Sequence, residues 1–492
     1  MIPRTLIAIL FVSIITQSAY AQRAVFPPLT AEQQAAKQAL IDSITVSPDK
    51  RRPNIVLIFA DDMGYADIGC YGSTEIPTPH IDALASQGMT FTSAYATAGT
   101  CSPSRAGLLT GQYQQRLGFE FNTGVGETTE RLGRGLDPSA LTIADVLSKS
   151  GYRTGMVGKW HVGSRKQFHP ANRGFDFFYG FLDGGHTYIQ RGRLTKEESA
   201  IAGRGGSTTP MLRGFNEEVE EEYLTDAFAR EAVAFINRQS AANPFFLYLP
   251  FNAVHTPLQA TQKYKDRFSH VPDLKRRILY AMTSATDDAV GRVVQALEEK
   301  GFAEDTMVVF FNDNGGPLYT GVQSNAPLRM GKLFLFEGGI RVPLIVKWPG
   351  VVGGGSVCDG VVSALDMLPT FGDVAGATLP SSLRTDGVNL TPWLTGRRTD
   401  SPNEALFWRN GGNRAIRSGK WKMVEVPSHV WLFDLETDIG ERKNMAKEQP
   451  DVVRELQRKY REWESTIEDP AWPPKSNHPT ETIDGVEYSV NV

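Results

Sequence analysis

The feature that most constrains the fold is a series of short apolar runs that end in polar residues. The run Ile55–Ala60 is continuously apolar, and Asp61 and Asp62 follow it directly. Such a run is typical of a strand covered on both faces, as in a parallel sheet. Similar runs are Thr154–Val157, Phe245–Leu249, Met307–Phe311 and Leu344–Trp348. Helical patterns between them, such as Ala289–Glu299, predict an α/β doubly wound fold.

Charged and amide side chains follow four of these predicted strands. Ligands of doubly wound folds bind beyond the carboxyl ends of the strands, so we expect these residues to converge on one site. They are Asp61 and Asp62, Lys159 with His161, His255, and Asp313 with Asn314.

The N-terminus has the pattern of an export signal. One basic residue, an apolar run of about a dozen residues and the small-residue segment Ala19–Ala21 predict a signal peptide over residues 1–21. The apolar run is shorter than the ~20 residues that a membrane-spanning helix needs, and we expect no membrane span elsewhere. The protein is therefore expected to be exported, either periplasmic or secreted. Residues 22–50 are polar and predict an N-terminal surface segment.

The pattern of the chain changes after about residue 385. Segments 406–410, 413–424 and 430–438 have the pattern of short antiparallel strands, and residues 450–464 form an amphipathic helical pattern. We therefore expect a catalytic domain over residues 51–384 and a smaller C-terminal α+β subdomain over residues 385–492.

Charge and cysteine content exclude some functions. The formal net charge is -4, so no general basic field favours nucleic acid, and an anionic substrate has to be met by cations gathered locally. The three cysteines, Cys70, Cys101 and Cys358, are too few for a disulfide scaffold. The sequence leaves open whether Cys70 and Cys358 pair.

Asp61, Asp62, Asp313 and Asn314 offer only oxygen atoms as metal ligands. Hard oxygen donors suit calcium or magnesium better than zinc. Either segment alone could be a solvated turn, because Asp, Asn and Gly favour turns. Two such segments at the ends of apolar strands favour a metal site.

Cys101 lies in the segment T-C-S-P-S-R, where its neighbours are polar. Pro103 suits the first turn of a helix, which makes Ser102 the expected N-cap and places Cys101 at the start of the helix. Backbone amides and the helix dipole favour an anion there, and Arg105 adds a cation. The alternative is an ordinary capped helix with a buried cysteine.

Lys159, His161, His255 and Lys332 complete the candidate site. Each one alone could be a structural histidine or a solvated lysine. Together with Arg105 they form a group of cations around an oxygen-ligated metal, which suits an ester of a tetrahedral oxyanion, either phosphate or sulfate.

The segment C-S-P-S-R-A-G-L-L-T-G, residues 101–111, resembles the signature C-x-P-S-R-x-x-x-L-T-G of the formylglycine-dependent (type I) sulfatases. Further segments resemble other blocks of that family in the same order: N-I-V-L-I-F-A-D-D-M-G-Y, G-K-W-H-V-G, N-A-V-H-T-P, N-D-N-G and G-K-L-F-L-F-E-G-G-I-R-V-P. The resemblance spans about residues 52–465. It implies the alkaline phosphatase-like α/β fold, in which helices flank a large central mixed, mostly parallel sheet. A smaller C-terminal antiparallel sheet plus helix completes that fold.

The resemblance also implies the chemistry of the site. A formylglycine-generating or anaerobic sulfatase-maturing enzyme oxidises the cysteine, here Cys101, to Cα-formylglycine. One hydroxyl of the hydrated aldehyde attacks sulfur, and the other then loses its proton to expel sulfate. The implied calcium ligands are Asp61, Asp62, Asp313, Asn314 and an oxygen of residue 101. In the implied roles, Arg105 holds the diol, and Lys159 and Lys332 bind sulfate oxygens. His161 assists deprotonation, and His255, with Lys332, assists the leaving group as general acid.

Two other functions remain as alternatives. Phosphoric and phosphonic ester hydrolases of the same superfamily resemble one another in having an Asp-His-Gly ligand segment, whereas this chain has Asp313-Asn314-Gly315. The loss of that imidazole favours calcium and a sulfatase. A non-catalytic binder of sulfated glycans is the second alternative, and the presence of Cys101 and of every carboxylate argues against it.

The segment Phe177–Tyr188 is rich in aromatic residues and glycine, and it contains Asp183 and His186. Sugar sites combine apolar walls with a few polar anchors, so we expect a sulfated carbohydrate as substrate, with Asp183 and His186 as contacts. The basic run Arg191–Lys196 could meet further anionic groups. The alternative is that the aromatic residues pack in the core and the basic run is a solvated loop.

Overall fold

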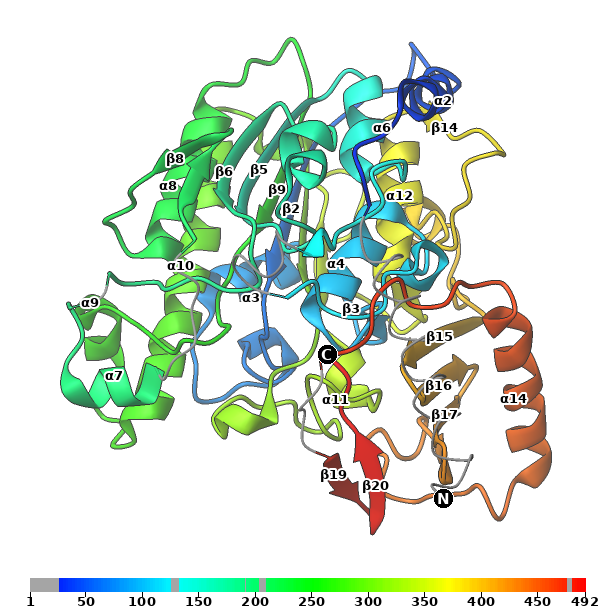
Figure 1. Ribbon diagram of the computed structural model, residues 1–492. Helices are drawn as coiled ribbons and strands as arrows, with labels where there is room; N and C mark the ends of the chain where they lie inside the picture. Colours follow the sequence, from blue (N-terminus) through cyan, green and yellow to red (C-terminus); the bar gives the residue numbers. More distant parts are fainter. Residues whose placement is uncertain (1–25, 125–131, 191, 203–208, 476–479) are drawn as a thin grey trace, which may run out of the picture.

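A ten-stranded sheet forms the centre of the larger part of the protein (Figure 1). The computed structural model describes residues 26–124, 132–190, 192–202, 209–475 and 480–492. The order of the strands across the sheet is β12-β3-β11-β10-β2-β9-β5-β6-β7-β8. Their bounds are β2 Asn54–Ala60, β3 Met89–Phe91, β5 Arg153–Lys159, β6 Phe177–Phe181, β7 Met211–Arg213, β8 Asn216–Glu218, β9 Phe245–Pro250, β10 Thr306–Asn312, β11 Leu344–Lys347 and β12 Ser356–Cys358.

The centre of this sheet is parallel and its flanks are mixed. Strands β10, β2, β9, β5 and β6 run parallel to one another. Strand β11 is antiparallel to both β10 and β3, and β7 and β8 are antiparallel at the opposite edge. The mixed sheet implied by the family resemblance is therefore confirmed.

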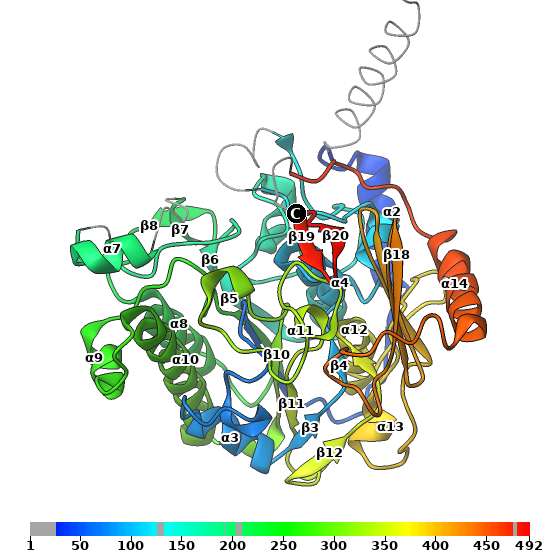
Figure 2. The same ribbon diagram turned by 90° about the horizontal axis from the view of Figure 1, so that it is seen from below.

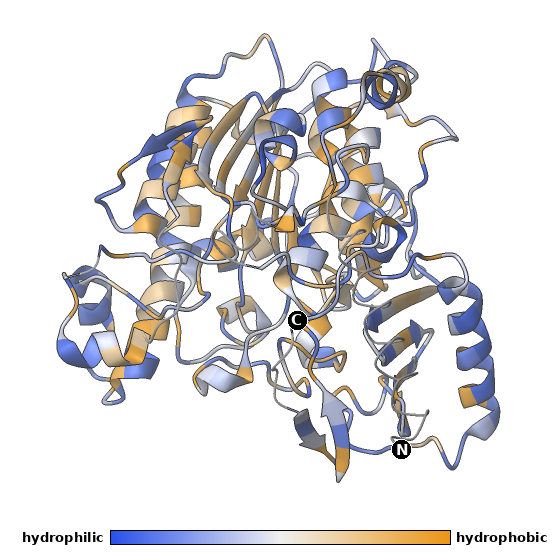
Figure 3. Ribbon diagram, in the orientation of Figure 1, coloured by the Kyte–Doolittle hydropathy of each residue, from blue (hydrophilic) through white to orange (hydrophobic). Residues whose placement is uncertain are grey.

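Two hydrophobic cores cover the two faces of the sheet. Alternate residues of β2 point to opposite faces, so Val56 and Ile58 lie in one core and Ile55 and Leu57 in the other. Helices α3 (Pro79–Ser86), α8 (Leu224–Asn237) and α10 (Leu274–Glu299) pack on the first face. Helices α4 (Cys101–Thr110), α6 (Ile143–Lys149) and α12 (Met367–Val374) pack on the second. Figure 3 shows the apolar colour of the central strands between these helices.

The C-terminal part contains a four-stranded antiparallel sheet, β15-β16-β17-β18, as the sequence predicts. The strand bounds are β15 Ala405–Asn410, β16 Asn413–Ser418, β17 Trp421–Val426 and β18 His429–Asp434. Helix α14 (Pro450–Glu464) packs on one face through Leu456, Tyr460 and Trp463. The other face packs against helix α11 (Glu337–Ile340) and its surroundings. A final hairpin, β19 (Thr480–Ile483) with β20 (Val486–Ser489), lies beside α11 (Figures 1 and 2).

The remaining elements are short or peripheral. Helix α2 (Ala31–Asp42) has no buried residue, in keeping with a surface segment. Helix α13 (Thr391–Leu394) packs in the core of the large sheet, although it lies beyond residue 385. The others are β1 Thr45–Val46, β4 Ala94–Tyr95, β13 Val362–Ser363, β14 Ala377–Thr378, α7 Lys196–Ala202 and α9 Gln262–Lys265.

The predicted signal peptide, residues 1–21, lies outside the described residues. Within the described part of the chain, the structure has no helix with the length and apolar character needed to cross a bilayer. Cys70, Cys101 and Cys358 are all free thiols, so the pair that the sequence left open is not formed.

Candidate active site

The carboxyl ends of the central parallel strands meet at one edge of the sheet. The register pairs Asn312 of β10 with Ala60 of β2, so Asp313 and Asp61 lie side by side. Lys159 ends β5, and His255 follows β9, the strand between β5 and β2. The polar residues that follow these strands in the sequence therefore do converge.

Three buried carboxylates form the centre of the cluster. Asp61, Asp62 and Asp313 have no exposed surface. The Asp62 backbone N–H donates to Asp313 Oδ1 over 3.3 Å, and Asn314 Nδ2 donates to Asp62 Oδ1 over 2.8 Å. Asp62 has a left-handed backbone (φ 60°), a conformation that Asp tolerates better than most residues and that turns the chain sharply after β2.

Each carboxylate has a buried cation beside it. Lys159 Nζ lies 2.5 Å from Asp61 Oδ2, and Arg105 lies 2.8 Å from Asp313 Oδ2. Lys332 Nζ lies 2.7 Å from the Asp62 carboxylate. The six charges therefore balance, which makes their burial tolerable.

These pairs set the ionisation of the cluster. Burial opposes the charged form of Asp61, but Lys159, His255 and Arg105 outweigh it and lower the pKa of that carboxyl. Lys332 lowers the pKa of Asp62 in the same way, against burial. Burial and the neighbouring Asp61 carboxylate raise the pKa of Asp313. A further positive charge nearby, such as a metal ion, would favour the ionised form of Asp313.

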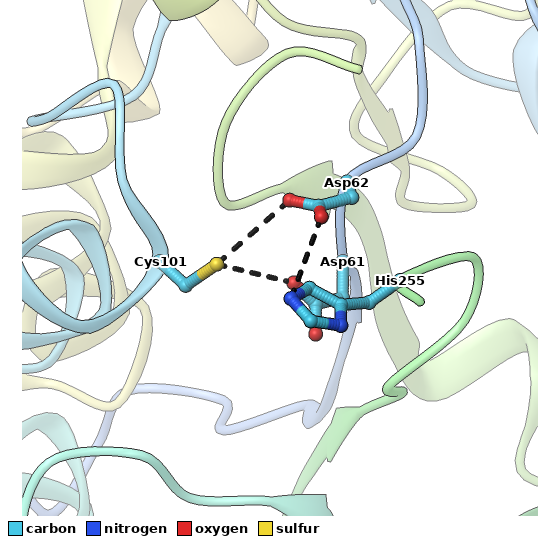
Figure 4. Close-up of side chains that lie close together, drawn as sticks. All are labelled: Asp61, Asp62, Cys101 and His255. Atoms are coloured by element: carbon cyan, nitrogen blue, oxygen red, sulfur yellow. Dashed lines mark hydrogen bonds and ion pairs between the residues drawn. The ribbon is translucent and has the colours of Figure 1, made fainter. Parts of the chain in front are cut away.

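Cys101 is the first residue of helix α4 and faces the carboxylates (Figure 4). Its Sγ lies 3.5 Å from Asp61 Oδ1 and 3.8 Å from Asp62 Oδ1. Lys332 Nζ lies 3.1 Å from the same sulfur. Burial raises the pKa of the thiol well above its usual value. Because the thiolate is the reactive form of cysteine, unmodified Cys101 is a poor nucleophile here.

The prediction that Ser102 is the N-cap of this helix is wrong. Thr100 occupies that position with an extended backbone, and Ser102 is already helical. Pro103 still lies in the first turn, where a missing N–H leaves no internal hydrogen bond unmade. The Ser102 N–H donates instead to Asn122 Oδ1 over 3.1 Å, and its hydroxyl donates to the His161 carbonyl over 2.5 Å.

Both predicted histidines are near this cluster. His255 Nε2 is 3.6 Å from Asp62 Oδ2. His161 is buried with a left-handed backbone (φ 61°), and its Nδ1 has no hydrogen-bond partner among the described residues. Burial and nearby cations lower the pKa of both rings, with Lys332 acting on His255 and Lys159 on His161. These shifts favour the neutral form of both imidazoles.

Gly184 brings a second segment into contact with the site. A Cβ added at Gly184 would lie 2.6 Å from His161 Nε2, and one added at Gly185 would lie 3.5 Å from His255 Cε1. The first distance is shorter than any normal contact, so a Cβ at position 184 requires the His161 ring to move.

The aromatic residues near this segment are core residues and do not form a sugar-binding platform. Phe178, Tyr179, Phe181 and Tyr188 are buried in the two faces of the large sheet, because a strand of this sheet is covered on both sides. Tyr188 has a further role. Its hydroxyl donates to the carbonyl of Asn252 and, over 2.9 Å, to that of His255.

The two predicted substrate contacts flank the glycine pair. Asp183 is 2% exposed. His186 is half-buried, and its two ring nitrogens lie 2.8 and 3.0 Å from the carbonyls of Thr187 and Thr209. Arg191 lies outside the described residues, and Arg193 donates to the Glu221 carbonyl.

A cavity of about 560 Å³ opens on this cluster, and His255 and Lys332 form part of its lining. A larger cavity, of about 690 Å³, lies beside Lys37 and Asp145 and includes none of the predicted site residues. The smaller cavity is of ordinary size for a ligand pocket, and it is lined by predicted site residues.

The residues present fit a hard divalent cation. Ligand atoms of Asp61, Asp62, Cys101 and His255 lie within 4.8 Å of one another. The buried Asn314 Oδ1 has no hydrogen-bond partner among the described residues, which leaves one oxygen donor unsatisfied. Asp61 and Asp62 offer carboxylate oxygens and Asn314 offers an amide oxygen, and oxygen ligands of this kind suit calcium or magnesium.

Sequence reasoning missed three residues that organise the site: Asn122, Tyr188 and Gly184. Asn122 accepts a hydrogen bond from the Ser102 N–H, and Tyr188 donates one to the His255 carbonyl. Gly184 has no side chain, which leaves room for the His161 ring. Each acts on a residue 20 or more positions away, so no local pattern marks it. The glycine pair at positions 184 and 185 was the one sequence feature that could have indicated a close contact here.

The family model named Sulfatase matches residues 53–377, and the model named N-sulphoglucosamine sulphohydrolase, C-terminal, matches residues 329–466. The chain is 34% identical to human (Homo sapiens) N-acetylgalactosamine-6-sulfatase over 394 residues, covering 77% of this chain and 72% of that protein. It is 37% identical to human arylsulfatase A over 454 residues, covering 82% of this chain and 86% of that protein.

Solved structures agree with these matches. The crystal structure of Ps i-CgsB in complex with k-i-k-neocarrahexaose superposes with a TM-score of 0.78 at 37% identity, covering 86% of this chain and 94% of that one. The phosphonate monoester hydrolase of Agrobacterium radiobacter has a TM-score of 0.62 at 22% identity, covering 84% and 95%, and shares the fold. The chain belongs to the sulfatase family of the alkaline phosphatase-like superfamily and is a sulfuric ester hydrolase.

Proposed function

We propose that this sulfatase hydrolyses sulfate esters of a sulfated carbohydrate, using formylglycine made from Cys101 and a calcium ion. The observation that carries the proposal is the position of Cys101, buried at the start of α4 within 4 Å of Asp61, Asp62 and Lys332. A buried thiol with a raised pKa has no evident use there unless it is modified. A formylglycine-generating or anaerobic sulfatase-maturing enzyme is then a necessary partner.

Formylglycine at position 101, once hydrated, would supply the nucleophilic oxygen that cysteine cannot. Calcium, when bound by Asp61, Asp62, Asp313, Asn314 and an oxygen of residue 101, would supply positive charge to the reacting oxygens. The carboxylates of Asp61, Asp62 and Asp313, which are paired with Lys159, Lys332 and Arg105, would then interact with the ion as well.

The chain's own residues account for binding and proton transfer. Lys159 and Lys332 hold the sulfate oxygens, and Arg105 orients residue 101 from the next turn of α4. His255 protonates the leaving oxygen from Nε2 when the ring carries its second proton, because Nδ1 already faces the Thr256 carbonyl and Nε2 faces the carboxylates. His161 is neutral and its Nδ1 is unpartnered among the described residues, so the ring has the capacity to accept a proton from residue 101.

The sugar substrate is supported by the relatives. One of them is named for N-acetylgalactosamine 6-sulfate, and Ps i-CgsB was solved with a hexaose. Asp183 and His186 flank the glycine pair that touches both histidine rings, which keeps them as candidates for sugar contacts. Residues 1–21, which the sequence predicts to be a signal peptide, would bring the enzyme to the periplasm or the medium.

A parallel assay tests this function. The matured enzyme is offered N-acetylgalactosamine 6-sulfate, galactose 4-sulfate and sulfated oligosaccharides containing them, together with 4-nitrophenyl sulfate and 4-nitrophenyl phosphate. We expect the highest kcat/KM on a sulfated sugar and little activity on the phosphate. A preference for the phosphate would favour the phosphoric ester alternative, and binding without turnover would favour the glycan-binder alternative.

A further inference from the structure

The cavity beside Lys332 has two walls that come from distant parts of the chain. One wall is the 3-10 turn Leu318–Thr320. The other is the C-terminal hairpin of β19 and β20 with the residues that follow it, which lies next to α11 (Figure 2). His255 and Lys332 lie in the same lining. A substrate with its sulfate at the cation cluster therefore has its alcohol part between these walls.

The first wall presents an exposed aromatic ring on a fixed turn. Tyr319 is 60% exposed, and it lines the same cavity as Lys332. The turn is held at its base, where Lys332 N–H donates to the Gly316 carbonyl over 3.1 Å and Asn325 Nδ2 donates to the same carbonyl over 2.8 Å. An aromatic face fixed beside a sulfate-binding lysine suits the apolar C–H face of a sugar ring.

The second wall carries a carboxylate. The hairpin is anchored because the Leu335 N–H donates to the Tyr488 hydroxyl over 3.1 Å, and Asn413 Nδ2 donates to the Ser489 carbonyl over 2.6 Å. Glu481 projects from this hairpin into the cavity lining and is exposed. Among the described residues, no lysine, arginine or histidine lies within ion-pair distance of Glu481. Its negative charge is therefore available to the cavity.

We propose that this cavity is the subsite for the sugar that carries the reacting sulfate, and that it selects a sugar with one sulfate. Tyr319 packs against the ring, and Glu481 accepts a hydrogen bond from a neighbouring hydroxyl or amide. The Glu481 carboxylate repels a second sulfate on that sugar, and repulsion between like charges in one cavity is large enough to decide between substrates. The inference rests on the proposed carbohydrate function and adds its selectivity.

Paired sugars test the carboxylate. The matured wild-type enzyme is compared on N-acetylgalactosamine 6-sulfate and its 4,6-disulfate, and on galactose 4-sulfate and its 2,4-disulfate. We expect kcat/KM to favour the monosulfated sugar by about tenfold. Glu481→Gln keeps an acceptor but removes the charge, so the preference should fall to about twofold or less. Glu487→Gln is the matched control, because Glu487 lies in register with Thr482 on the other face of the same hairpin.

A binding measurement separates recognition from catalysis. In the Cys101→Ser background, calorimetry with the same four sugars should show the same preference and the same loss of it in Glu481→Gln. Tyr319→Ala should weaken binding of all four about tenfold, whereas Tyr319→Phe should not. Phe215→Ala, at another exposed aromatic residue (54% exposed), is the control and should change nothing.

The outcomes distinguish the two proposals. If the wild-type enzyme desulfates none of the sugars but does hydrolyse 4-nitrophenyl sulfate, the proposed carbohydrate function fails, and the inference fails with it. If it desulfates them with no preference, or with a preference that Glu481→Gln leaves unchanged, the function stands and the inference is overturned.

Discussion

The Lys422 ammonium and the Glu337 carboxylate form an ion pair of 2.8 Å that is fully buried between the C-terminal sheet and helix α11. Glu441 lies 3.6 Å from the same lysine, and its other carboxylate oxygen accepts a hydrogen bond from the Glu337 N–H. Glu337 lies five positions after Lys332 in the sequence. The C-terminal subdomain therefore fixes the loop that carries a sulfate-binding lysine of the proposed site.

Lys422→Met should destabilise the protein by about 3–5 kcal/mol, because it leaves two buried carboxylates with one fewer cation. Urea denaturation followed by fluorescence measures the shift in midpoint. Arg458→Met is the control, since Arg458 pairs with Glu462 on the exposed face of α14 and such pairs contribute little. An equal shift in both variants would contradict the structural role given to Lys422.

Gly184→Ala should lower kcat at least a hundredfold while changing stability little. A methyl group at this position would lie 2.6 Å from His161 Nε2, so the His161 ring must move. Small displacements of catalytic groups cost this much in rate. Steady-state kinetics and thermal unfolding are measured together. Gly353→Ala is the control, because nothing lies within 4 Å of its added Cβ. Full activity in Gly184→Ala would show that the close contact has no catalytic consequence.

Asp62→Ala and Asp313→Ala should each abolish turnover and weaken calcium binding. Either change removes a hard oxygen ligand and leaves Lys332 or Arg105 without its partner. Enzyme treated with a chelator should regain activity with calcium and not with zinc, because the donor set is dominated by oxygen. Restoration by zinc alone would contradict the assignment of the ligands. Calorimetry with calcium gives a readout that does not depend on activity.

Much of the site was predictable because it is built from strand ends. The register of parallel strands β10, β2, β9 and β5 brings Asp61, Lys159, His255 and Asp313 together without any information beyond the apolar runs. The start of α4 was misplaced by two residues, since Ser102 and Thr100 are both good N-caps and only the backbone at Thr100 is extended.

Other parts depend on contacts that no local pattern contains. The aromatic segment Phe177–Tyr188 was compatible both with an exposed sugar-binding platform and with a strand buried on both faces. In the structure its aromatic side chains are buried, because helices cover both faces of the sheet. The wall of the pocket formed by Glu481 depends on the C-terminal hairpin returning to α11, some 140 residues from it in the sequence.

The most direct test of this account is the chemical state of residue 101. Mass spectrometry of the peptide containing it is compared with kcat, for protein made with and without the maturing enzyme. We predict that kcat on 4-nitrophenyl sulfate rises in proportion to the formylglycine fraction, and that protein retaining Cys101 is nearly inactive although it still binds the sulfated sugar. Full activity in protein whose residue 101 is unmodified cysteine would contradict the proposed chemistry.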